Sequence, residues 1–190
     1  MRRLTLISLF AAAMVALGLT FITVPNVELV TLTCFLAGVF LGTRDGIAAA
    51  ALGEGLYSFL NPMGAAAPPL FLAQVIGMSL AAFVGSMSAK DTFWLFVRFK
   101  IDKTKWPIWK SSIFFGVLGL LLTLIFDLLT TASFLLFAGL SVEKFIASLV
   151  FGMYFYFLHI GFNTLIFAGV LPVIIPRLET WFLLEQGNRG

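Results

Sequence analysis

The stretch "SIFFGVLGLLLTLIF" (Ser112–Phe126) contains no charged residue and no regular alternation of apolar and polar positions. A membrane-spanning helix needs about 20 mostly apolar residues. Strands of a membrane barrel instead alternate with period two over roughly ten residues. The apolar run extends well beyond this stretch, over residues 111–137. We therefore predict a helix that crosses lipid.

The composition of the whole chain supports the same environment. The chain has 190 residues, of which 61% are hydrophobic and 11% charged, and its mean hydropathy is +1.06. Soluble domains carry about 25% charged residues, and a chain of this size still exposes roughly a third of its extended surface. Backbone groups in lipid must be hydrogen-bonded internally. We predict an all-α integral membrane protein with a single domain over residues 1–190.

Six apolar segments are long enough to be considered as spanning helices. The second and third are short, so we expect them to be tilted or partly re-entrant, and we expect the last to end or kink near Pro172 and Pro176. The first exceeds the apolar core of a usual signal peptide, so we expect it to be retained. The predicted helices cover residues 4–23, 29–41, 46–60, 69–88, 111–137 and 142–175, with an amphipathic loop over 89–110.

The basic residues predict the orientation of these helices. With six spans and both termini in the cytoplasm, eleven of the twelve Lys and Arg residues fall on the inner side, and only Lys144 falls outside. Cytoplasmic loops carry such an excess. The net charge of +3 therefore reflects topology, and we expect no nucleic-acid partner. The loop "KDTFWLFVRFKIDKTKWPIWK" (Lys90–Lys110) interleaves aromatic and basic residues, which favours the lipid headgroup layer or a docking surface for a partner.

Polar residues inside the apolar segments indicate a cavity. Glu54 and Asp127 would each cost about 2.5–3.5 kcal/mol at the centre of a bilayer, so they are candidates for function. Polar neighbours at i+3, i+4 and i+7 place them on polar stripes. The stripes are Glu54, Tyr57, Ser58 and Asn61; Asp127, Thr130 and Thr131; and Tyr156, His159 and Asn163, with Gln74 in addition. We predict that they line a cavity in the outer half of the membrane. The alternative is that Asp127 pairs with His159 only to hold helices together.

The loop "TFITVPNVELVTL" (Thr20–Leu32) is predicted to cover that cavity. Pro25 fixes φ and ends the first helix, after which Asn26 and Glu28 direct hydrogen-bonding groups toward a ligand. A plain solvated turn is the alternative.

Catalytic and metal-binding motifs are missing from the sequence. One histidine and one cysteine, Cys34, give no two-histidine or thiolate metal site, and there is no Gly-x-Ser-x-Gly or phosphate-binding loop. We expect no enzymatic activity, no cofactor and no bound metal.

Small residues recur at helical spacing on two segments. Ala12 and Ala16 lie four apart, as do Gly77, Ala81 and Gly85. Such faces allow close helix approach, either within one chain or between chains.

Taken together, these features resemble the substrate-binding S components of energy-coupling factor (ECF) transporters. The segment "FLAGVFLGTRDGIAAAALGEGLYSFLNP" (Phe35–Pro62), with its tight turn over Gly42–Gly46, is similar to their second and third helices. The resemblance implies an S-component-like bundle in the plasma membrane of a prokaryote that binds a vitamin or related micronutrient from outside. It implies a transmembrane coupling protein, docked at Ala12 and Ala16, and two cytoplasmic ATPases. The candidate ligand residues are Asn26, Glu28, Gln74, Asp127, His159 and Asn163.

The sequence leaves the substrate open. The stretch "PNVELVT" (Pro25–Thr31) resembles the loop of S components assigned to cobalamin or its precursors, whereas Glu28 and Asp127 suit a cationic or donor-rich ligand. Pantothenate, a queuosine precursor and a flavin also remain open. The lack of paired histidines near the N-terminus argues against nickel and cobalt. Two other functions stay open as well: a non-transporting assembly subunit, and a solitary uptake protein that works without the ATPases.

Overall fold

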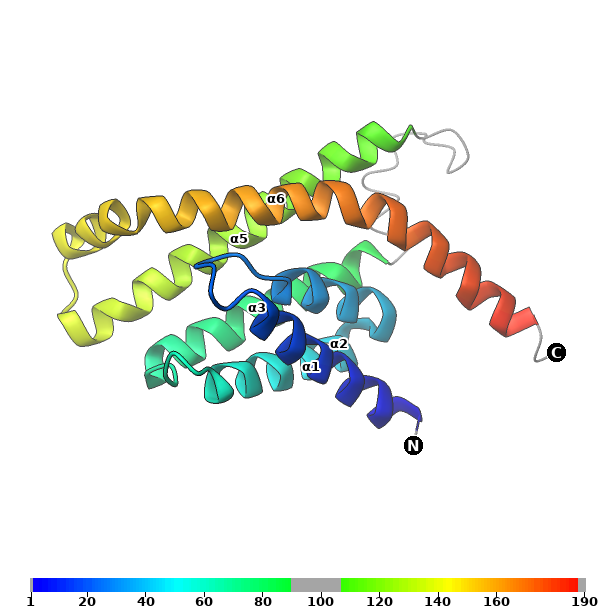
Figure 1. Cartoon of the computed structure of the whole chain (residues 1–190), viewed down its shortest axis with the longest axis horizontal. Coiled ribbons are helices and arrows are strands. Elements are labelled where there is room, and N and C mark those ends of the chain that lie inside the picture. The colour runs from blue at the N-terminus through cyan, green and yellow to red at the C-terminus, as the bar shows by residue number, and fades with distance from the viewer. Residues whose placement is uncertain (1, 90–106, 188–190) are drawn as a thin grey trace.

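The computed structural model describes residues 2–89 and 107–187, and within these residues every regular element is a helix (Figure 1). The helices are α1 (Arg2–Thr20), α2 (Val30–Leu60), α3 (Pro68–Ser88), α5 (Ile108–Ala138) and α6 (Val142–Gly187). All five of these described helices are long and apolar enough to cross a membrane. The prediction of an all-helical membrane protein is therefore confirmed at that level.

The second and third predicted helices are one element in the structure. They form α2, which is broken at Gly42, where φ is 77° and ψ is −178°. The chain folds back at Gly42 and brings Gly46 against Gly38. A Cβ atom on Gly46 would lie only 2.6 Å from the Cα of Gly38. Residues eight apart in a straight helix would be separated by about 12 Å. The described chain thus has five helices where the sequence predicted six, and α2 is a helical hairpin with arms over residues 30–41 and 43–60.

The other predicted boundaries agree to different degrees. The helix predicted over 69–88 is α3, and the one predicted over 111–137 is α5, which begins at Ile108 and so takes in the end of the predicted loop. The remainder of that loop, residues 90–106, lies outside the described residues. The first helix ends at Thr20 instead of residue 23.

The end of the last helix was predicted wrongly. We expected it at residue 175, but α6 continues to Gly187. Pro172 and Pro176 do not terminate it, and Figure 1 shows instead that the helix changes direction in its orange-to-red part. Helices in membranes tolerate proline where neighbouring groups satisfy the freed backbone.

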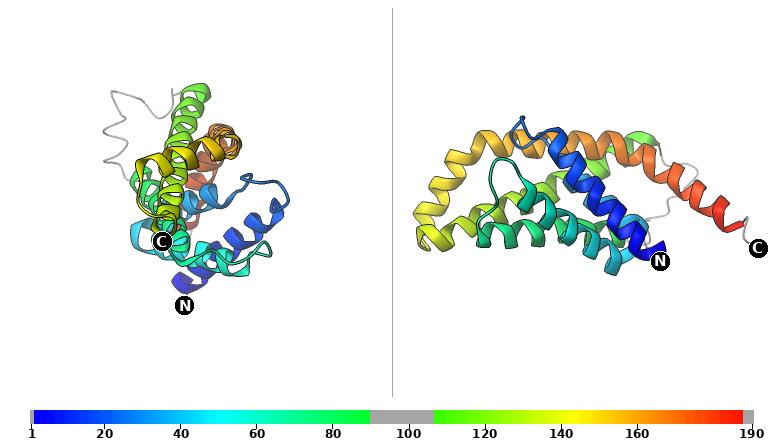
Figure 2. Two further views of the ribbon diagram at one scale, coloured as in Figure 1. Left: turned by 90° about the vertical axis from the view of Figure 1, so that its left-hand side faces the viewer. Right: turned by 60° about the horizontal axis from the view of Figure 1, so that its bottom comes forward.

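The helices pack in two groups, α1 with α2 and α3, and α5 with α6 (Figures 1 and 2). Glycines allow α2 and α3 to approach closely: a Cβ on Gly38 would lie 1.8 Å from the carbonyl oxygen of Ala82, and one on Gly85 would lie 2.0 Å from that of Phe35. Phe35 also contacts Phe167 of α6, with ring centroids 5.4 Å apart. The core therefore joins both groups, and loop 21–29 lies beside α6 near the middle of its length (Figure 1).

The two small-residue faces have different surroundings. Gly77, Ala81 and Gly85 on α3 are buried inside the chain, where they serve internal packing. Ala12 and Ala16 on α1 are exposed. Only the α1 face is open to a partner or to lipid.

Candidate functional site

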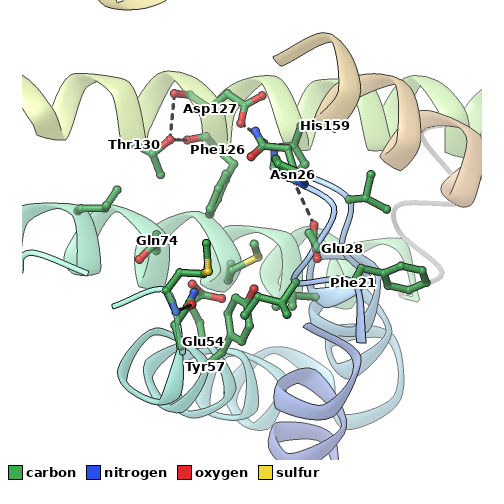
Figure 3. A pocket seen from close by; sticks show the side chains of 18 of the residues that line it. Phe21, Asn26, Glu28, Glu54, Tyr57, Gln74, Phe126, Asp127, Thr130 and His159 are labelled. Atoms are coloured by element: carbon green, nitrogen blue, oxygen red, sulfur yellow. Dashed lines mark hydrogen bonds and ion pairs between the residues drawn. The ribbon is translucent and has the colours of Figure 1, made fainter. Parts of the chain in front are cut away.

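A cavity of about 540 Å³ lies where loop 21–29 meets α2, α3, α5 and α6. Its polar lining comes from all of these parts, and Figure 3 shows α5 above, α3 in the middle and α2 below. The polar residues are Asn26, Glu28, Glu54, Tyr57, Asn61, Gln74, Asp127, Thr130, Thr131, Tyr156 and His159. The apolar residues are Phe21, Ile22, Val24, Pro25, Val27, Val30, Met63, Leu70, Met78 and Phe126.

Loop 21–29 is fastened to α6 at Asn26. The residue has a positive φ of 58°, a conformation that asparagine adopts more readily than most residues. Its side-chain Nδ2 donates to the carbonyl oxygen of Phe155 at 3.3 Å. The residue lines the cavity, and its side-chain amide contacts the protein and holds the loop in place.

Glu28 holds the same loop through more hydrogen bonds than Asn26 does. Its carboxylate accepts hydrogen bonds from the backbone nitrogen of Thr31 at 2.9 Å and from its hydroxyl at 2.6 Å. It also accepts from Nδ2 of Asn163 at 3.2 Å and lies 3.4 Å from Nε2 of His159. Burial acts to raise the pKa of the Glu28 carboxyl, but His159 and Thr31 outweigh it and leave that pKa below its ordinary value.

His159 joins Glu28 to α5. Its Nδ1 lies 2.7 Å from Oδ1 of Asp127, so each of its ring nitrogens faces a carboxylate oxygen. The side chains of His159 and Asp127 are both buried. The pairing of Asp127 with His159, which the sequence offered as an alternative to ligand binding, is therefore present. It occupies only one of the two oxygens of Asp127.

A second polar group links α2 with α3. The hydroxyl of Ser58 lies 3.2 Å from Oε1 of Glu54 and 3.1 Å from Oε1 of Gln74. A hydroxyl carries a single proton, so it can donate to only one of these acceptors at a time. Glu54 is 2% exposed, which makes it one of the most buried polar side chains in the described part of the chain.

Acceptor atoms remain without a donor at this site. Among the described residues, Oε2 of Glu54 and Oδ2 of Asp127 are buried and have no hydrogen-bond partner. A buried polar atom that lacks a partner costs about 1–3 kcal/mol, and more when it is charged. Both residues line the cavity.

The structure places five of the six predicted ligand residues on the cavity wall: Asn26, Glu28, Gln74, Asp127 and His159. The sixth, Asn163, is fully buried and supports Glu28 instead. The list of candidate ligand residues missed Glu54, Tyr57, Asn61, Thr130, Thr131 and Tyr156. Each of these residues belongs to one of the polar stripes, so the spacing at i+3, i+4 and i+7 could have identified it as a candidate.

The charged side chains around the cavity are mostly acidic. Three of its lining residues are acidic, none is lysine or arginine, and His159 is the one lining residue that can carry a positive charge. Within residues 2–89 and 107–187, no group of three His, Cys, Asp or Glu side chains has an arrangement able to hold a metal ion.

Comparisons of this chain with protein-family models, with curated proteins and with solved structures gave no match. The chemistry of the site is therefore argued from its own geometry. That geometry is a cavity lined by polar and apolar residues, with three acidic side chains among them, closed on one side by a loop that two side chains hold against α6.

Proposed function

We propose that this protein is the membrane-embedded substrate-binding subunit of an ECF-type importer, which captures a vitamin or related micronutrient at the extracellular side of a prokaryotic plasma membrane. The observation that carries the proposal is the cavity itself. In a chain whose helices are apolar enough to cross lipid, eleven polar residues from four helices and the two loops 21–29 and 61–67 surround a space of about 540 Å³. Small-molecule sites have volumes of about 300–1,000 Å³.

The unpaired acceptors favour ligand binding over a purely structural role. Interhelical bonding accounts for Oδ1 of Asp127, which contacts His159. It does not account for Oδ2 of the same residue or for Oε2 of Glu54, which have no partner among the described residues. A bound molecule with hydrogen-bond donors would satisfy both atoms. Polar groups at membrane depth are costly, so their retention without internal partners points to a function.

The proposed topology has six crossings with both termini in the cytoplasm, and the two arms of α2 count separately. In Figure 1 the start of α1 and the end of α6 lie on the right, whereas the connection between α5 and α6 lies on the left. In this proposed topology, Lys144 would be the one residue of the twelve Lys and Arg residues on the outer side. Loop 21–29 would then close the cavity from outside.

Energy for import would come from partners. A transmembrane coupling protein and two cytoplasmic ATPases would supply this energy, since the sequence has no phosphate-binding loop of its own. Ala12 and Ala16 are exposed on α1 and would form the contact with the coupling protein.

Thermal unfolding of the purified protein against a panel of vitamins and their precursors tests the binding role. Cys34 is the only cysteine and is fully buried, so a thiol-reactive dye reports unfolding at one position. A ligand at a hundred times its dissociation constant should stabilise the fold by about 2.7 kcal/mol. The shift should disappear in Asp127→Asn and persist in Glu143→Gln, an exposed glutamate outside the cavity lining.

Purification from the native membrane separates the alternatives. Co-purification of ATPase subunits supports the importer, whereas a ligand-induced shift without them supports a solitary uptake protein. Failure of every compound, together with loss of folded protein in Asp127→Asn, would contradict both and favour a structural subunit.

A further inference from the structure

The proposed function does not specify the ligand. The charged residues of the cavity restrict its chemical class. We propose that the ligand is a small organic cation rich in N–H donors, and that it reaches from Glu54 on α2 to Asp127 on α5. This inference rests on the proposed function, because it names the substrate class of the same site.

The charged residues of the lining disfavour an anionic ligand. Glu28, Glu54 and Asp127 line the cavity, and no lysine or arginine does. His159 is the one lining residue able to carry a positive charge, and both of its ring nitrogens already face carboxylate oxygens. The lining offers a ligand carboxylate or phosphate no cationic side chain other than His159, so an anion would lose its hydration with little charge compensation.

The unpaired acceptor atoms lie on opposite walls of the cavity. Figure 3 shows Asp127 on the upper wall of the cavity and Glu54 on the lower wall. Each has one buried oxygen without a partner among the described residues. Two acceptors on opposite walls fit a ligand with donors at both ends, and hydrogen bonds in which one partner is charged are about twice as strong as neutral ones.

Glu28, which the sequence nominated for ligand binding, is not part of this pair. Its two oxygens already receive hydrogen bonds from Thr31 and Asn163 and face His159. The Glu28 carboxylate therefore holds loop 21–29 in place. Glu54, together with Asp127, is the carboxylate proposed to bind the ligand.

Aromatic rings line the cavity near both carboxylates. Tyr57 lies beside Glu54, and the ring of Phe126 projects from α5 toward the interior of the cavity (Figure 3). Phe126 also packs against His159, with ring centroids 5.7 Å apart at 82°. Aromatic faces attract organic cations. A flat cation would use these rings and both carboxylates together.

Three compounds of nearly equal shape and different charge test the inference: benzamidine, benzamide and benzoate. The readout is the unfolding midpoint of the full-length protein, reported by a thiol-reactive dye at Cys34. Benzamidine at ten times its dissociation constant should raise the midpoint by roughly 3–6 °C for a chain of this size. Benzamide should raise it less, and benzoate should leave it unchanged.

Matched variants locate the effect. Benzamidine has donors at one end only, so Glu54→Gln and Asp127→Asn should each reduce its shift by removing one negative charge from the cavity, whereas Glu143→Gln should retain it. Where Asp127→Asn yields no folded protein, Glu54→Gln alone carries this comparison. The order of the three compounds in the unmodified protein does not depend on either variant.

Two outcomes overturn the inference: a benzoate shift as large as that of benzamidine, and equal behaviour of all three compounds, including no shift with any. The vitamin panel distinguishes this failure from failure of the proposed function. Stabilisation by an anionic vitamin such as pantothenate would retain the binding subunit and refute the cationic ligand. A benzamidine shift without any vitamin or precursor response would support the cation site and contradict vitamin uptake.

Discussion

Replacing Gly42 by alanine tests the turn that makes α2 a hairpin. The backbone there has φ 77° and ψ −178°, a region that is essentially restricted to glycine and costs other residues about 1–3 kcal/mol. No atom lies within 4 Å of the position that a Cβ would take. The substitution therefore adds no clash, and its whole effect comes from the backbone conformation.

Gly161→Ala is the matched control. Gly161 lies inside α6, and a Cβ added there would likewise meet no atom within 4 Å. In a helix interior alanine is more favourable than glycine by about 0.5–1 kcal/mol. The two variants add the same methyl group into open space, so we expect their stabilities to differ by about 1.5–4 kcal/mol.

The assay is again the unfolding midpoint of the purified protein, read at the buried thiol of Cys34. Each kcal/mol should move the midpoint by about 2–4 °C in a chain of this size. Gly42→Ala should fall below the unmodified protein, and Gly161→Ala should equal or exceed it. Equal midpoints for the two variants would refute the reasoning, because the turn would then not depend on a glycine-only conformation.

Three further predictions follow from the packing and the site. Glu28→Gln should lower the free energy of unfolding by about 1.5–3 kcal/mol, because it removes a charged acceptor. Since the pKa of Glu28 lies below its ordinary value of 4.5, this loss of stability should be present above pH 4.5 and should shrink as pH falls further. Gly85→Ala should lower the unfolding midpoint by the equivalent of about 1–3 kcal/mol or more, because its Cβ would lie 2.0 Å from the Phe35 carbonyl oxygen. Ala12→Leu combined with Ala16→Leu should change stability by less than about 0.5 kcal/mol, because both positions are exposed, yet abolish co-purification with the coupling protein.

Controls accompany each of these variants. Glu143→Gln, at an exposed position, should show no comparable loss at neutral pH, and an unchanged midpoint for Glu28→Gln would contradict the role of Glu28 in holding loop 21–29. Gly169→Ala, with open space at its Cβ, should not destabilise. Full recovery of ATPase subunits with the double leucine variant would show that α1 is not the face that contacts the coupling protein.

The sequence alone determined the environment, the helical class and most of the polar wall. Apolar runs near 20 residues and a low charged fraction require lipid, and lipid requires internally bonded helices. The i+3, i+4 and i+7 spacings around Glu54, Asp127 and His159 predicted which polar residues share a helix face, because that period is a local property of the backbone. Asp127 and His159 line the cavity for this reason, whereas Asn26 and Glu28 reach it from loop 21–29.

Tertiary structure decided how those faces meet. Glu28 and His159 are 131 residues apart, and only the packing of loop 21–29 against α6 brings them within 3.4 Å. That contact commits Glu28 to the protein and leaves Glu54 and Asp127 with the unpaired oxygens. Likewise, the sequence contained Gly42, but the approach of Gly38 to Gly46 defines the hairpin. Periodicity within a segment says which side chains share a face, and only long-range packing says which donors and acceptors remain for a ligand.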